Sequence, residues 1–175
     1  MLLLASGATS CMAEIAAGPS SSLTREAPTG FAGDLRLGIG GSKRPEVGLV
    51  DFGGHARFRF DARYKEVGLG NSFGVGLNLG VVGARFRAGY SIAPLIKRDE
   101  HFGFSPFGAF AQSTIFICPT ADCFESGRNR QTLYLLGTVG VDQRVHWRST
   151  DFIFGSDAFG YALIGVGSHW AVKIF

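Results

Sequence analysis

Residues 55–64, with the sequence HARFRFDARY, alternate between two kinds of side chain at every position. One set consists of Ala56, Phe58, Phe60, Ala62 and Tyr64, and the other consists of His55, Arg57, Arg59, Asp61 and Arg63. A period of two places these sets on opposite faces of an extended strand. The pattern therefore predicts a strand with one aromatic face and one charged face, each turned toward a different environment.

The same arrangement returns further along the chain, where residues 84–87 repeat the letters ARFR of residues 56–59. This interval accommodates two strands and two connections, so both copies should run in the same direction. No stretch of 18 or more apolar residues follows the N-terminal segment, which argues against a helical membrane span. We therefore predict an all-β fold, a closed antiparallel up-and-down β-barrel, because this is the other architecture that satisfies its backbone groups within lipid.

Eight strands account best for the pattern, and ten is the alternative because the C-terminal part of the chain can be divided in more than one way. The expected extended segments are residues 34–39, 47–52, 55–64, 73–79, 84–90, 102–117, 132–141, 144–150, 152–154 and 158–175. Gly53 and Gly54 would supply a tight turn or a bulge before residue 55. Gly74 and Gly76 alternate with apolar residues, and on the inner face they would leave space beside bulky arginines.

Residues 1–17 have features of a secretory signal. Their apolar start is followed by the small residues Cys11 and Ala13, which are suitably spaced for cleavage before Glu14. No positively charged residue precedes Arg25, so either translation begins upstream of Met1 or the segment forms something else, such as a small-residue helix. Residues 18–30 have no periodic apolar face and are expected to form a linker or N-terminal tail. Residues 31–175 would then form the barrel domain.

Composition agrees with a single barrel domain. The 175 residues include 26 glycines and 16 phenylalanines but 6 prolines, a balance that favours bent, aromatic-faced strands over a disordered chain. The formal net charge of +3 comes from arginines that alternate with Phe and Ala, so nucleic-acid binding is not expected. Cys118 and Cys123 flank a short polar connection and can close a disulfide loop in an oxidising compartment. Zinc binding is the rival interpretation, but the sequence places no histidine nearby.

Residue type decides which face of the barrel meets which solvent. In lipid, the outer face carries Phe, Leu, Val and Ala, whereas an arginine turned outward at the bilayer centre costs about 2–4 kcal/mol. The expected lipid-facing side chains are Phe58, Phe60, Tyr64, Phe86 and Tyr90, with both tyrosines near strand ends, where an aromatic girdle would place them. The expected lumen charge network consists of Arg57, Arg59, Asp61, Arg63, Arg85 and Arg87, with Asp51, Asp61, Glu66 and Asp142 as candidate acidic partners.

Over roughly residues 31–175 the chain resembles the small outer-membrane β-barrel proteins of Gram-negative bacteria, the OmpA-like and OmpX-like class. The resemblance is one of pattern and rests on the alternating segments, the export-like start, the cysteine-bearing loop and the terminal aromatic Phe175. That family typically ends in an aromatic residue that is read during barrel assembly, with apolar residues at alternating positions before it. Lys173 occupies one of those positions here, which departs from the family pattern.

The resemblance implies a bacterial outer-membrane location, membrane lipid as a partner and a monomeric barrel whose loops can meet an envelope protein or surface partner. A lumen filled by salt bridges is the favoured interpretation of the arginines, and an anion-attracting lumen is the alternative. No catalytic residue, cofactor or metal site is predicted.

Two further functions stay open. A soluble lipocalin-like barrel that binds a small apolar ligand has the same period with its apolar face turned inward. An outer-membrane lipid-modifying enzyme would need a serine nucleophile beside a histidine base, but none of His55, His101, His146 and His169 is followed by serine two positions on.

Overall fold

The protein is a closed eight-stranded β-barrel in a computed structural model that describes residues 8–23, 30–42, 49–60, 64–79, 81–99, 101–118, 129–148 and 151–173. The strands are β1 (Ala8–Ser22), β2 (Gly30–Ser42), β3 (Leu49–Phe60), β4 (Tyr64–Asn78), β5 (Val82–Arg98), β6 (His101–Ile117), β7 (Asn129–Arg148) and β8 (Asp151–Lys173). Every strand pairs antiparallel with its neighbours in sequence, and β1 pairs with β8 to close the sheet. The predicted fold class is confirmed, with eight strands and not ten.

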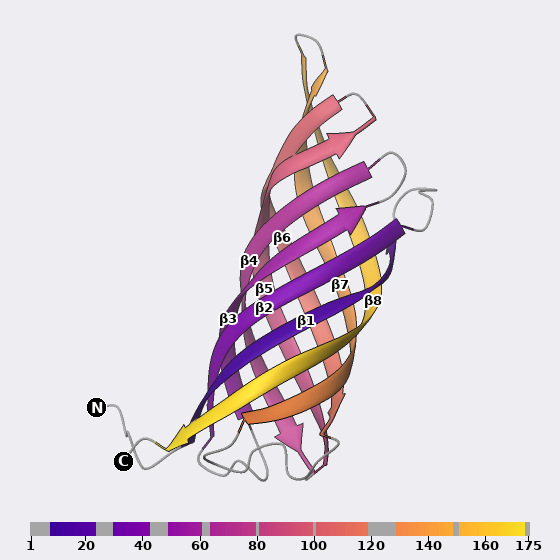
Figure 1. The fold of residues 1–175 in the computed structure, drawn as a ribbon. Coiled ribbons are helices and arrows are strands. Elements are labelled where there is room, and N and C mark those ends of the chain that lie inside the picture. Colours follow the sequence, from indigo (N-terminus) through magenta and orange to yellow (C-terminus); the bar gives the residue numbers. More distant parts are fainter. Residues whose placement is uncertain are drawn as a thin grey trace, which may run out of the picture.

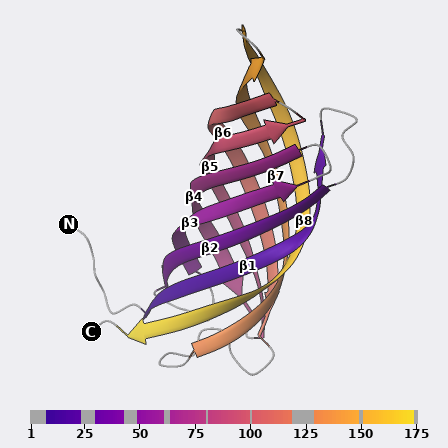
Figure 2. The same cartoon turned by 45° about the horizontal axis from the view of Figure 1, so that its top comes forward.

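The hairpins at the end of the barrel away from the termini stand at successive heights (Figure 1). The β7–β8 hairpin reaches furthest, as the turned view also shows (Figure 2). Pairing explains this step. The last cross-strand pair that β1 makes with β8 joins Ser22 to Phe159, whereas β7 and β8 remain paired as far as Arg148 and Asp151. Strand tilt and register stagger are linked in any closed barrel, and here they produce the slanted rim.

Side chains alternate between a buried and an exposed position along most strands. On β5, Arg85 and Arg87 are buried while Phe86 is 54% exposed. The interior also contains an apolar cluster, which consists of Met12, Ala16, Ala32, Phe110, Phe116, Cys118, Tyr134, Leu136, Phe159, Tyr161 and Leu163. In the part of the chain that the structure describes, no helix is long and apolar enough to cross a membrane.

The predicted strand over residues 55–64 is wrong, because β3 ends at Phe60 and β4 begins at Tyr64. The pair Phe60 and Lys65 joins the two strands in a hairpin, and residues paired across strands share a face of the sheet. Lys65 therefore lies on the outer face with Phe60, and Tyr64 points inward. The expected turn at Gly53 and Gly54 is also wrong, because both residues lie within β3.

The N-terminal segment differs from the prediction as well. Residues 8–22, expected to belong to an export signal and a linker, form β1 and hold the sheet closed between β2 and β8. The physical reason is an alternation that the small residues conceal, because Met12, Glu14 and Ala16 are buried whereas Cys11 and Ile15 are exposed. Removing residues 1–17 would delete most of this strand, so the barrel starts well before residue 31.

Candidate functional site in the barrel lumen

The barrel interior holds a network of charged side chains, which we call the lumen network. Among the described residues, the buried side chains include six arginines and six carboxylates, so their formal charges balance. The members are Glu14, Asp34, Arg36, Asp51, Arg57, Arg59, Glu66, Arg85, Arg87, Asp142, Arg144 and Asp157. They come from every strand except β6, which supplies Gln112 to the same interior. The predicted network of arginines and acids is therefore present in the lumen.

One half of the lumen network is centred on Glu14 of β1. Its carboxylate oxygens lie 2.7 Å from Nη1 of Arg85, 2.9 Å from Nη1 of Arg87 and 3.6 Å from Nη1 of Arg36. Asp51 of β3 joins the same group, because it accepts from Arg36 Nη2 at 2.5 Å and from Arg87 Nε at 3.2 Å. These five residues, the Glu14 cluster, link four strands through ion pairs in the barrel interior.

The other half is centred on Glu66, close to the hairpin that joins β3 and β4. Glu66 accepts hydrogen bonds from Arg57 Nη2 at 2.8 Å, from Arg59 and from the Tyr64 hydroxyl group. Arg144 of β7 lies 3.5 Å from the same carboxylate. Asp142 and Asp157 complete this Glu66 cluster, with Arg57 Nη2 3.2 Å from Asp142 and Arg144 Nη2 2.5 Å from Asp157.

Aromatic rings pack against the charged groups. The guanidinium carbons of Arg57 and Arg59 lie 4.3 Å and 4.5 Å from the centre of the Phe159 ring. Arg85 is placed 4.5 Å from the centre of the Phe116 ring. Such cation–π contacts are stronger when the groups are desolvated. The buried rings can therefore stabilise the guanidinium groups in addition to the carboxylates.

Glycines on the inner face make room for the arginines, as the sequence predicted. A Cβ atom at Gly74 would lie 2.6 Å from Cγ of Arg87 and 3.0 Å from Asp51 Oδ1. A Cβ atom at Gly76 would lie 2.8 Å from Cγ of Arg85. Both distances are too short for carbon atoms in contact, so the side chains of the Glu14 cluster occupy the space that these glycines leave.

Asp34 and His55 lie beside members of the two clusters, because Asp34 is opposite Arg57 and His55 is opposite Arg36 in the pairing of β2 with β3. Asp34 accepts a hydrogen bond from the Tyr161 hydroxyl group at 3.4 Å. His55 meets Phe110 edge to face, with ring centres 4.6 Å apart. His55 is therefore packed in the barrel interior. The described residues contain no group of three or more His, Cys, Asp or Glu side chains suited to a metal ion.

The structure brings together four of the predicted network residues, Arg57, Arg59, Arg85 and Arg87, and places Phe58, Phe60, Phe86 and Tyr90 on the outer face. Tyr64 is a correction: it was expected on the outer face but hydrogen-bonds to Glu66 inside the barrel. Asp61 and Arg63 lie outside the described residues. Cys118 is buried after β6, and Cys123 also lies outside the described residues, so their disulfide stays a prediction.

Sequence reasoning missed the central role of Glu14 and the other members of the network that were not predicted, which are Asp34, Arg36, Arg144 and Asp157. The signal-like start of the chain predicts a cleavage site directly before Glu14. The alternation of Glu14 with Ala13 and Ile15 instead indicates a strand. Asp157 lies between two expected strands, so no period marked it. The charge balance of the interior was the available clue, because four inward arginines require several buried acids.

Comparisons with known proteins found no match to this chain among family models, curated proteins or solved structures.

Proposed function

We propose that this chain is an outer-membrane β-barrel protein of a Gram-negative bacterium, with a structural or interaction role and a lumen closed by salt bridges. Membrane lipid is its partner along the outer wall, and it acts as a monomer whose connections can meet a surface or envelope protein.

The distribution of side chains between the two faces of the sheet carries this proposal. In the described part of the chain, 34 large apolar side chains are at least 40% exposed, while all twelve members of the lumen network are buried. A monomeric protein in water rarely exposes so much contiguous apolar surface. Lipid is the solvent that matches an apolar outside and a charged inside.

The packing of the interior favours a closed barrel over a channel. An eight-stranded barrel has an interior just wide enough for side chains to fill. Here the Glu14 cluster and the Glu66 cluster span the lumen between strands on different sides of the barrel, for example from Arg57 of β3 to Asp142 of β7. With six arginines facing six carboxylates, the described interior has no net charge that would attract a mobile anion.

A soluble barrel that binds a small apolar ligand is less well supported, because such a barrel needs an apolar interior. The described interior contains ion pairs at its centre, and its apolar cluster is packed against them. The outer wall of such a protein would also leave Phe52, Phe73 and Phe86 more than half exposed to water.

Membrane fractionation tests the proposal directly. We expect the chain to pellet with outer membranes, to resist extraction by salt and high pH, and to dissolve in detergent. The folded barrel should migrate faster on an unheated gel than on a heated one. Recovery of a folded barrel from the soluble fraction without detergent would contradict the proposal.

A further inference from the structure

A row of outward side chains crosses five neighbouring strands near the hairpin end of the barrel. The cross-strand pairs join Phe31 of β2 to Phe60 of β3, Phe60 to Lys65 of β4, Lys65 to Lys97 of β5, and Lys97 to Phe102 of β6. All five side chains are exposed. The row therefore consists of two adjacent lysines flanked by phenylalanines. A lysine among apolar side chains can lay its stem along them and extend its ammonium group toward a polar headgroup.

The two lysines are the distinctive feature of this row. Among side chains whose burial the structure describes, Lys65 and Lys97 are the only exposed cations, and no carboxylate of the described residues forms an ion pair with either. Lys97 Nζ lies 5.4 Å from the centre of the Phe102 ring. Like charges directly opposite each other on a sheet repel, so this pair lowers stability unless an anion lies between the ammonium groups.

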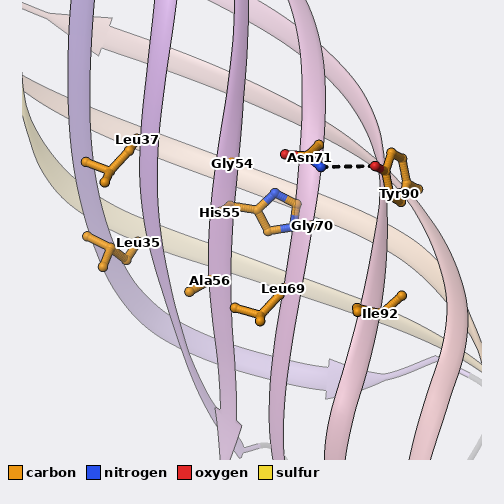
Figure 3. A pocket seen from close by; sticks show the side chains of 10 residues that line it. All are labelled: Leu35, Leu37, Gly54, His55, Ala56, Leu69, Gly70, Asn71, Tyr90 and Ile92. Carbon is orange, nitrogen blue, oxygen red and sulfur yellow. Dashed lines mark hydrogen bonds between the residues drawn. The ribbon is translucent and has the colours of Figure 1, made fainter.

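Below the lysines, the same two strands contribute to a groove in the outer wall (Figure 3). The groove has a volume of about 600 Å³ and opens outward. Its walls include Leu35, Leu69 and Ile92, and Gly54 and Ala56 keep its floor low. The Asn71 amide donates to the Tyr90 hydroxyl group at 3.0 Å, so these outward polar groups satisfy each other (Figure 3).

The register connects the lysines to the groove. Along β4, Lys65 is followed on the outer face by Val67 and then by Leu69, which lines the groove. At about 3.3 Å per residue, the lysine row lies roughly 13 Å from Leu69 along the strand. An amphiphile whose phosphate meets the ammonium groups would therefore lay its acyl chain into the groove.

From this juxtaposition we infer that the outer wall over β2–β5 is a binding site for a phosphate-bearing lipid. Lys65 and Lys97 hold the phosphate of the headgroup, and the groove between Leu35, Leu69 and Ile92 holds an acyl chain. The inference rests on the proposed function, because it requires the wall to face lipid. Beyond a wall that faces lipid, the site would give the barrel a preference for anionic lipid, and this preference would depend on Lys65 and Lys97.

Native mass spectrometry of the full chain tests the site. The protein is released from detergent micelles that contain equal amounts of phosphatidylglycerol and phosphatidylcholine with the same acyl chains, and the retained lipids are counted. We expect phosphatidylglycerol to be preferred by about fivefold per lysine, the strength of attraction for a basic side chain at an anionic membrane surface. Lys65→Gln/Lys97→Gln should abolish the preference, whereas Lys65→Arg/Lys97→Arg should keep it. Lys43→Gln/Arg44→Gln, which removes two charges elsewhere in the chain, should also keep it.

The groove is tested by a pair of glycine substitutions. A Cβ atom at Gly54 would meet its nearest neighbours at 3.6 Å and 3.8 Å, so Gly54→Leu fits and fills the groove. Gly137 on β7 has no atom within 4 Å of such a Cβ and is a matched control on the same outer face. Gly54→Leu should reduce retention of both lipids, while Gly137→Leu should leave retention unchanged.

Three results would overturn the inference. They are equal retention of the two lipids by the unmodified chain, an unchanged preference in the double glutamine variant, and displacement of the lipid by excess inorganic phosphate alone, which would indicate a site for free phosphate. Heat-dependent gel migration of the same preparations separates this outcome from failure of the proposed function. A heat-modifiable barrel without lipid preference refutes the lipid site only, whereas a barrel that stays folded and soluble without detergent refutes both.

Discussion

Within the lumen network, the carboxylate charge of Glu14 is the most informative charge to remove. Glu14→Gln keeps the size of the side chain and leaves Arg36, Arg85 and Arg87 with Asp51 as the remaining carboxylate of the cluster. Arg36 and Arg87 each keep an ion pair with Asp51. Because breaking a buried ion pair by removing one partner leaves an uncompensated charge, we expect a loss of about 3–5 kcal/mol in the free energy of unfolding. Typical domains have about 5–15 kcal/mol in total, so the effect is large.

A second substitution shows whether the loss comes from the contact between Glu14 and the Arg85 guanidinium group, which lies 2.7 Å from the Glu14 carboxylate. In Glu14→Gln/Arg85→Met, the new thioether chain can pack where the Arg85 guanidinium lies 4.5 Å from the Phe116 ring. The double variant should therefore be more stable than the sum of the two single losses predicts, by about 0.5–3 kcal/mol. Asp151→Asn is the control, because Asp151 is exposed and its loss should change stability by about 0.5 kcal/mol or less.

The assay is urea unfolding of the barrel in lipid vesicles, followed by tryptophan fluorescence and by gel migration. Our reasoning is refuted if Glu14→Gln costs less than about 1 kcal/mol, since the buried charges would then not depend on one another. It is also refuted if the losses of the two single variants simply add.

Four further substitutions test the inner and outer faces separately. Tyr64→Phe should cost about 1–3 kcal/mol in urea unfolding, because its hydroxyl group bonds to a buried carboxylate, and Tyr90→Phe, on the outer face, should cost less; equal losses would place both residues in similar surroundings. Gly74→Val should lower the yield of heat-modifiable barrel and cost about 1–3 kcal/mol by overpacking the lumen, and normal yield and stability would show that the interior has free space. Val139→Arg, in the middle of β7, should destabilise the barrel in vesicles by up to about 4 kcal/mol, and an unchanged barrel would mean that this wall does not meet lipid.

The sequence was sufficient to predict the fold class and the inward direction of Arg57, Arg59, Arg85 and Arg87. If the phenylalanines face lipid, as we propose, their alternation with arginine turns every one of these arginines toward the lumen. The repeated ARFR letters indicate two strands that run in the same direction. The acidic partners Asp51, Glu66 and Asp142 were also identifiable, because buried arginines need carboxylates.

Other features could not be read from the period of the pattern. Alternation continues through residues 61–63, so the hairpin between Phe60 and Tyr64 left no break in the sequence and Tyr64 was assigned to the wrong face. The first strand was missed for a different reason. Its small residues gave almost no contrast between inner and outer positions, and its one charged member, Glu14, depends on arginines that are distant in sequence.

That distance has a consequence for assembly. Glu14 and Arg85 are separated by 71 positions in the chain, and Arg57 and Asp142 by 85. Neither pair lies on neighbouring strands, so these partners meet only when the sheet curls around the lumen. If the barrel inserts into a bilayer, as we propose, an open sheet would present unneutralised guanidinium and carboxylate groups to hydrocarbon at great energetic cost. Under that proposal, curling of the sheet and neutralisation of its interior should occur as one cooperative event, and half-closed intermediates should not accumulate.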